Sequence, residues 1–329
     1  MTNRIKWLSV LRGLNILLVI LVHVQLIDFS TGDNHLFCSN VSFPFHPIRM
    51  PLFIFISGGL LYISRIRKNI PTQQLYKDKF QRIVLPFIFF VNVYFIIKVL
   101  FNNFTKTPVE FSLIYYLKSF IYFRGFSSQS LWFLAVLMEL MLIYPFFCYL
   151  CKKLYRMILF LIFCCIIYFV DSDLDSPWNI LYIMEMQHYL IYFFFGILFF
   201  RYNLYRFINK IVVLPVLILL YIVSYYYYIP LFTSILGILM MCAICINVAN
   251  FMPNCFSSFR DYIYQIYLMS LPFQTFVELV LWKHLFYNEQ YFYVFYLINV
   301  LSGLYIPILI SKVVKRCNIK LIRLCFGLQ

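Results

Sequence analysis

The sequence predicts an all-α, polytopic membrane protein, and three observations lead to this fold class. The chain has 329 residues, of which 64% are hydrophobic and only 12% are charged, whereas soluble domains are roughly half apolar and about a quarter charged. The apolar residues form runs of about 20, the length of helix that crosses a hydrocarbon core of ~30 Å. No polar stretch is long enough for a soluble domain. We therefore expect a single membrane-embedded domain over residues 1–329.

The apolar runs divide the chain into about ten transmembrane helices. We place them at residues 8–27, 46–64, 83–101, 129–150, 154–171, 185–201, 211–229, 231–250, 262–282 and 291–311. We divide the seventh from the eighth at Ile229-Pro230, because proline disfavours continuation of a helix. These two residues offer only a very short turn. The longest expected outer loops are 28–45 and 102–128, with Cys38 exposed in the first.

The basic residues predict how these helices are oriented. Most of the 27 lysines and arginines fall on one side of the membrane if the N-terminus is cytoplasmic, as the positive-inside rule requires. With an even number of helices, both termini are then cytoplasmic. The formal charge of +15 is thus a topology signal, and we expect no nucleic-acid partner. A composition rich in Lys, Asn, Ile, Phe and Tyr is typical of AT-rich bacteria, so we expect the bacterial inner or plasma membrane.

The first helix carries two residues that are costly inside a bilayer, Arg12 and His23. They are 11 residues apart, so at ~100° per residue they share one face, about 16 Å apart along the axis. Asn15 lies on the same side, three residues after Arg12. This face predicts a polar path through the membrane. The alternative is a cationic anchor plus a buried histidine, but His23 cannot snorkel to water as Arg12 can.

Histidine and arginine suit different tasks in such a path. A neutral histidine in a dry pocket can take a proton from a hydroxyl. Arginine can bind an anionic or carbonyl group but cannot act as a base. The candidate catalytic residues are therefore His23, as general base, and Arg12.

Several motifs resemble the acyltransferase-3 family. The segment RGLNILLVILVH at 12–23 resembles its first-helix signature, an arginine followed by ten residues and a histidine. RMPLFIFISG at 49–58 is similar to its "MPLFFFISG", and KFQRIVLP at 79–86 to the start of its third helix. LWFL at 131–134 and YQIYL at 264–268 resemble later elements, in the right order. Where many members have an acidic residue and a late histidine, this chain has Ser9 and the pair Met269-Ser270, which leaves His23 as the main catalytic candidate.

The resemblance implies transfer of an acyl group, usually acetyl, from coenzyme A to a hydroxyl, typically of a surface sugar. Acyl-CoA would then be a donor substrate, and no bound cofactor is expected. The loop 65–82 supplies six basic residues against one acid, Asp78, and cationic side chains bind phosphate. We expect Lys79, Arg82, Arg67 and Lys68 to bind acyl-CoA, whose arm passes Arg12 toward His23. The loop could instead serve only to fix topology.

A glycan or lipid-linked sugar is the expected acceptor, and the lipid bilayer is the surrounding partner. Weaker candidates for acceptor contact are Trp132, Glu139, His46, Arg49 and Ser57. Two of them have a structural alternative: Glu139 could pair with a cation, and Ser57 with Gly58 suits close helix packing.

Two other functions compete with acyl transfer. A transporter or flippase for a lipid-linked glycan also needs polar groups in a bundle, but the chain shows no inverted repeat. A glycosyltransferase or polymerase favours an outer carboxylate cluster. The run Asp171, Asp173 and Asp175 resembles one, but nucleotide sugars are absent on the outer side. We expect no metal site.

Overall fold

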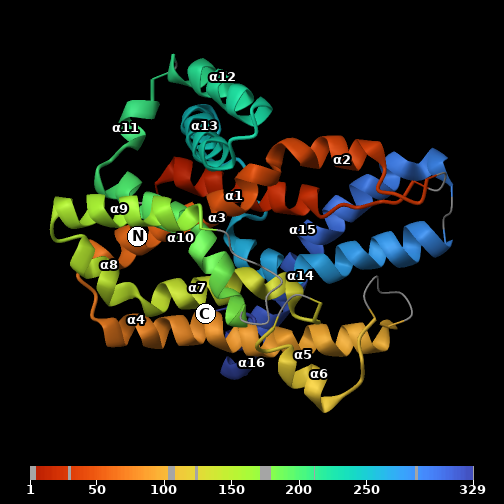
Figure 1. Cartoon of the computed structure of the whole chain (residues 1–329). Helices are drawn as coiled ribbons and strands as arrows, with labels where there is room; N and C mark the ends of the chain where they lie inside the picture. Colours follow the sequence, from red (N-terminus) through yellow and green to blue (C-terminus); the bar gives the residue numbers. More distant parts are fainter. Residues whose placement is uncertain are drawn as a thin grey trace. The chain divides into compact units, whose positions relative to one another are not determined.

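The computed structural model describes residues 5–28, 31–102, 108–122, 125–170, 179–210, 212–285 and 288–328. These residues form helices and contain no strand, apart from one isolated antiparallel bridge between Ile27 and Asn34 (Figure 1). The prediction of an all-α fold is therefore confirmed. The run Asp171 to Asp175 lies outside the described residues.

Each apolar run of the sequence corresponds to a helix or a pair of helices. The α-helices are α1 (Lys6–Val22), α2 (Leu36–Ser42), α3 (His46–Leu61), α4 (Thr72–Lys79), α5 (Leu85–Leu100), α6 (Leu113–Lys118), α7 (Trp132–Leu142), α8 (Tyr144–Leu150), α9 (Leu154–Tyr168), α10 (Ile183–Arg201), α11 (Tyr205–Ile208), α12 (Val213–Tyr226), α13 (Pro230–Phe251), α14 (Ile263–Phe276), α15 (Phe292–Arg316) and α16 (Lys320–Cys325). Short 3₁₀ or π-helical segments join several of them: η1 (Phe43–Phe45), η2 (Tyr62–Ile66), η3 (Phe80–Val84), η5 (Gln129–Leu131), η6 (Ile180–Tyr182), η7 (Arg260–Tyr262), η8 (Val277–Leu285) and η9 (Glu289–Tyr291).

Length and composition identify the helices able to cross a bilayer. Within the described residues five qualify: Leu36–Ile66, Thr72–Leu100, Ile180–Arg201, Pro230–Phe251 and Glu289–Arg316. The bent pair Gln129–Leu142 and Tyr144–Leu150 makes a sixth if it is one span. The chain is thus a helical membrane protein, while ten spans and two cytoplasmic termini stay predictions.

Prolines account for two irregular places in these spans. The expected helix 129–150 is bent by 55° between α7 and α8, where Pro145 lacks the N–H that would bond to the carbonyl four residues back. The π-helical segment η3 ends at Val84, two residues before Pro86 in the first turn of α5. Segments of this kind are rare and are often found at functional sites.

The chain forms two compact units. Unit 1 comprises residues 1–63 and 192–308, and unit 2 comprises residues 64–191 and 309–329. Unit 1 holds α1 to α3, the second part of α10, α11 to α14 and most of α15. Unit 2 holds α4 to α9, the first part of α10, the end of α15 and α16.

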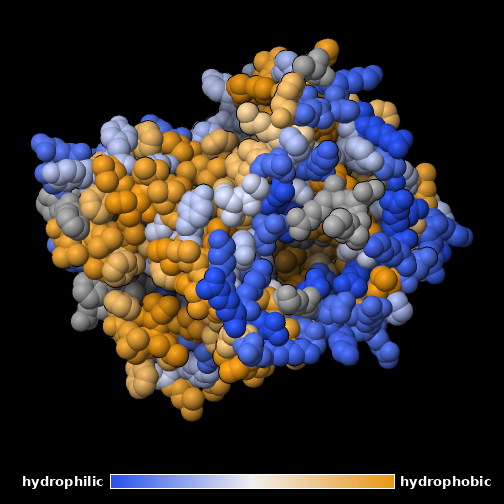
Figure 2. Space-filling model, turned by 180° about the vertical axis from the view of Figure 1, so that it is seen from behind, coloured by the Kyte–Doolittle hydropathy of each residue, from blue (hydrophilic) through white to orange (hydrophobic). Residues whose placement is uncertain are grey.

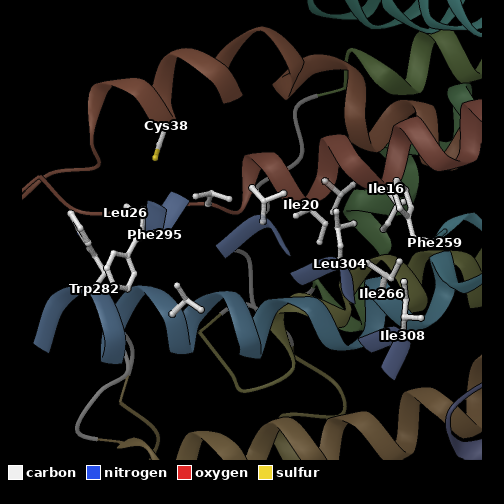
Figure 3. Packing of buried hydrophobic residues seen from close by; sticks show 14 of the residues in the cluster. Ile16, Ile20, Leu26, Cys38, Phe259, Ile266, Trp282, Phe295, Leu304 and Ile308 are labelled. Carbon is white, nitrogen blue, oxygen red and sulfur yellow. The ribbon is translucent and has the colours of Figure 1, made fainter. Parts of the chain in front are cut away.

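An apolar core joins α1 to the C-terminal helices of unit 1. Figure 3 shows Ile16 and Ile20 of α1 close to Ile266 of α14 and Leu304 of α15. Trp282 of η8 is fully buried at the other end of the cluster, and its indole Nε1–H donates to the Ile27 carbonyl at 2.8 Å. The end of α1 is therefore packed against two helices that lie far away in sequence.

The segment 28–45 is not the open loop that the sequence predicts. It contains α2, and Cys38 of this helix is only 1% exposed. Its thiol belongs to the same apolar cluster as Ile20 and Phe295, so the expectation that Cys38 is exposed is wrong. The sequence around it is too short and mixed to show a helical pattern.

Small residues let α3 and α10 approach closely within unit 1. A Cβ atom added at Gly58 would overlap the Phe193 backbone carbonyl, and one at Gly196 would overlap that of Phe55. Glycine permits such backbone contact, which drives helix association in membranes. The structural alternative for this region, close packing beside Ser57, thus has a direct geometric basis.

Unit 2 is held together by hydrogen bonds as well as apolar contacts. The Tyr76 hydroxyl of α4 donates to the Leu142 carbonyl at 2.7 Å, where α7 ends at the bend. The Tyr144 hydroxyl of α8 donates to the Ile70 carbonyl at 2.9 Å. Both bonds satisfy carbonyls that lack a donor from a further helical turn, one in the last residue of α7 and one in the loop before α4.

The surface is extensively apolar. Large side chains such as Leu159, Phe163 and Ile166 of α9 are exposed, and Figure 2 shows broad hydrophobic areas beside hydrophilic ones. A soluble protein rarely exposes contiguous apolar surface of this kind. The helices therefore present this surface to lipid.

Candidate active site

The last turn of α1 carries His23. The helix ends at Val22, five residues earlier than the sequence predicts, and His23 is its C-cap with near-helical backbone angles. Its N–H donates to the Ile20 carbonyl at 3.1 Å, and its side chain is partly buried. Because the backbone stays helical from Arg12 to the cap, the predicted shared face of Arg12 and His23 is consistent with the helix geometry.

Asn15 binds α3 rather than an open path. Its side chain is 1% exposed. With the amide oriented to satisfy both groups, it donates to the Arg49 carbonyl at 3.1 Å and accepts from the Phe53 N–H at 3.3 Å. A buried amide with two such bonds locks α1 onto one turn of α3. The expectation that Asn15 lines a polar path is thereby replaced by a structural role.

A proline fixes the same part of α3. Pro51 lies inside the helix and has no N–H for the Pro47 carbonyl. The hydroxyl of Ser234 on α13 donates to that carbonyl at 2.7 Å instead. The first turns of α3 are therefore anchored by α1 on one side and by α13 on the other.

These contacts bring several basic side chains near His23. His46 and Arg49, both on α3, are close enough to act electrostatically on its imidazole. Arg49 is partly buried, whereas His46 is exposed. Arg12 lies about three turns earlier on α1 and is also partly buried. His23, a titratable base, thus lies near the Arg49 cation, which would stabilise negative charge on a reacting oxygen.

The predicted donor-binding residues of unit 2 have different environments. Arg65, another cation of the same loop, forms an ion pair with Asp78 at 2.7 Å, so the only acid of the loop is already engaged. Arg67, Lys68 and Arg82 are exposed, whereas Lys79 is partly buried. Arg82 lies within electrostatic range of Lys79, and such a group of cations suits a ligand with several anionic groups.

Lys79 and Glu139 line one cavity in unit 2. The cavity has a volume of about 380 Å³, and most of its lining is apolar, including Ile83, Ala135 and Met138. Glu139 Oε2 is buried with no hydrogen-bond partner among the described residues. Glu185 lies within electrostatic range of Glu139, and its Oε2 accepts from Asn179 Nδ2 at 2.8 Å. The sequence assigned Lys79 and Glu139 to different substrates, but the fold places them around the same space.

The two remaining residues predicted to contact the acceptor, Trp132 and Ser57, have partners of their own. The Trp132 ring packs against Tyr182 and Tyr189, with ring centroids 6.0 and 5.3 Å away. The Ser57 hydroxyl donates to the Phe53 carbonyl of its own helix at 2.9 Å. Their predicted contacts with an acceptor are untested.

Sequence reasoning missed two buried amides beside α1. Gln274 of α14 is 1% exposed and Asn299 of α15 is fully buried. Both are polar residues inside apolar helices, a pattern that often marks a functional group in membranes. That signal could have singled them out, but their partners could not be read from the sequence.

The fold and the site define a class, a helical membrane protein with a histidine and two arginines partly buried in one of its units. The comparison with known families makes this class specific. The model of the acyltransferase-3 family, described as an acyltransferase domain, matches residues 5–312. The chain belongs to this family, and the resemblance seen in the sequence motifs is confirmed.

Membership of this family makes the protein a membrane acyltransferase. Neither the curated proteins nor the solved structures gave a match to the chain. The identity of the acyl group, the acceptor and the roles of individual residues are therefore inferred from the chemistry of the site.

Proposed function

We propose that the protein is an integral membrane O-acyltransferase of the bacterial inner membrane. It moves an acyl group, most simply acetyl, from cytosolic acyl-CoA to a hydroxyl of a sugar. The sugar belongs to a cell-surface polysaccharide or its lipid-linked precursor. The observation that carries this proposal is the position of His23, at the end of α1 and within electrostatic range of Arg49 and His46.

His23 acts as the general base. A ring nitrogen accepts the proton of the sugar hydroxyl as its oxygen bonds to the thioester carbonyl carbon. Arg49 stabilises the negative charge that builds up on the oxygens of the tetrahedral intermediate. The carbon–sulfur bond then breaks, and the leaving CoA thiolate takes the proton from the imidazolium. Histidine is thereby returned to its neutral form.

Unit 2 recognises the donor. Arg82, Arg67 and Lys68 are exposed cations that bind the phosphates of CoA, as lysine and arginine commonly do. The cavity beside Lys79 accepts the largely neutral pantetheine arm, whose amide N–H groups can donate to the Glu139 carboxyl. The arm passes Arg12 on its way to His23, and the guanidinium can donate to an amide carbonyl of the arm.

The decisive experiment measures transfer of labelled acetyl from acetyl-CoA to surface-glycan acceptors in membranes. His23→Ala should lower the rate by at least about a hundredfold, the usual contribution of a general base, at equal protein in the membrane. His284→Ala, which removes an exposed histidine of η8, serves as the matched control. Full activity in His23→Ala would contradict the assignment of the base.

The same assay separates acyl transfer from the alternative of a flippase. A flippase would move the lipid-linked glycan across the membrane without placing label in it. Translocation that is unaffected by His23→Ala, with no acetyl incorporated by the wild type, would favour the transporter.

A further inference from the structure

One backbone carbonyl joins His23 to a distant helix. Gln274 Nε2 of α14 donates to the Ile20 carbonyl at 3.0 Å. The same carbonyl accepts the N–H of His23 at 3.1 Å. The side chain of Gln274 and the backbone of His23 thus meet at a single oxygen.

This carbonyl lies in the last turn of α1, where a helix has the fewest hydrogen bonds of its own. The last carbonyls of an α-helix lack the N–H donors that a further turn would supply. In α1 the N–H groups of His23 and Val24 bond only three residues back, to Ile20 and Leu21, which tightens the turn. Gln274 adds a donor from another helix, and the turn is thereby tied to α14.

Helix α15 holds Gln274 in place. Asn299 Nδ2 donates to the Gln274 backbone carbonyl at 3.2 Å. One turn further along, a Cβ atom at Gly303 would come within 2.9 Å of Gln274 Cγ and Cδ. Glycine at this position therefore leaves the space that the Gln274 side chain occupies. All these residues belong to unit 1.

The bond through Nε2 is the contact that a substitution would remove. Gln274 is 1% exposed, and its Oε1 has no hydrogen-bond partner among the described residues. Burying an amide costs free energy unless it is hydrogen bonded, and the bond from Nε2 to the Ile20 carbonyl offsets that cost. Its donor bond is directed at the turn that carries the imidazole.

We propose that Gln274 is a positioning residue for acyl transfer. It fixes the last turn of α1, and through that turn it sets where the His23 imidazole lies, while Gly303 provides the space for it to do so. This inference depends on the proposed role of His23. It concerns a residue that contacts the backbone of the turn and is not itself expected to touch substrate.

The test combines kinetics with hydrogen exchange on the full-length protein in detergent. Gln274→Met keeps the side-chain volume but removes the donor. We expect kcat to fall about ten- to a hundredfold, as small misplacements of a reacting group do, with the donor KM changed less than about twofold. Amide exchange should rise in residues 20–24 and stay unchanged in α13.

Gly303→Ala provides a second route to the same state. The added methyl displaces the Gln274 side chain although the amide is retained, so exchange at 20–24 should rise and kcat should fall. Gly237→Ala on α13 is the matched control, because its Cβ would meet the Ile48 side chain at 2.6 Å instead. It should leave exchange at 20–24 unchanged.

Two results would overturn the inference. Unchanged kcat with unchanged exchange in Gln274→Met would show that the bond does not position the turn. Exchange that rises throughout unit 1, together with a lower melting temperature, would show that Gln274 only supports packing. If His23→Ala keeps full activity, the proposed base is wrong, but the exchange of residues 20–24 still reports separately on Gln274 and its bond to Ile20.

Discussion

The amide of Asn15 on α1 is hydrogen bonded to the backbone carbonyl of Arg49 on α3. Arg49 is the cation that acts on His23 from this helix. The neutral side chain of Asn15 therefore fixes the position of the Arg49 backbone. Asn15 thus joins two helices, whereas Arg12 and His23 are the residues of the first helix that we propose for the chemistry.

Replacing Asn15 should destabilise the protein. Asn15→Ala removes both hydrogen bonds between α1 and this turn of α3. At about 1 kcal/mol for each bond, we expect a loss of about 2 kcal/mol in the free energy of unfolding. Thermal unfolding in detergent would measure it. Asn247→Ala is the control, since the Asn247 amide donates to the Ala243 carbonyl of its own helix and to no other helix that the structure describes. A larger loss in Asn247→Ala than in Asn15→Ala would contradict this role.

Gly58→Ala should separate α3 from α10. The new methyl would overlap the Phe193 carbonyl, and because a backbone atom cannot rotate away, the helices themselves must shift. We expect a cost of about 3 kcal/mol or more, the upper end for overpacking, seen as a lower melting temperature. Gly237→Ala, whose methyl would meet the Ile48 side chain and no backbone atom, should cost less. Equal melting temperatures for the two variants would argue against a backbone contact at Gly58.

The fold class and the main helices could be predicted because hydrophobic length is a local property. Runs of about 20 apolar residues are recognisable without any tertiary information. The bend before Pro145 and the π-helical segment before Pro86 were not predicted, although proline supplies a local signal for both. Helix α2 was missed because its seven residues are too few to show periodicity.

The candidate site was only partly predictable, for a different reason. Arg12 and His23 are conspicuous, since charge within an apolar run is rare. Gln274 is equally polar for its surroundings, but its partner Ile20 is 254 residues away in sequence. The cavity that joins Lys79 to Glu139 likewise arises only when α4 and α7 pack together. Such pairs depend on tertiary contacts that no spacing in the sequence records.

The cavity of unit 2 predicts opposite effects on stability and on donor binding. Lys79 and Glu139 line it, and among the described residues no ion pair joins them. Each side chain therefore carries a cost of desolvation, which the nearby Asp78 offsets only in part for Lys79. Lys79→Met keeps an unbranched side chain of similar length and removes the charge. We expect the melting temperature to rise and the KM for acyl-CoA to increase about tenfold, since one charge-assisted hydrogen bond to a ligand is worth that much.

Lys68→Met is the matched control for this experiment. Lys68 is exposed on the same basic loop, so its loss should leave the melting temperature unchanged and raise the KM less, because exposed charges are screened by water and salt. Glu139→Gln should also raise the melting temperature, because it removes repulsion from Glu185. A lower melting temperature in Lys79→Met would instead identify Lys79 as a structural partner of Glu139, and an unchanged KM would exclude the cavity as the donor site.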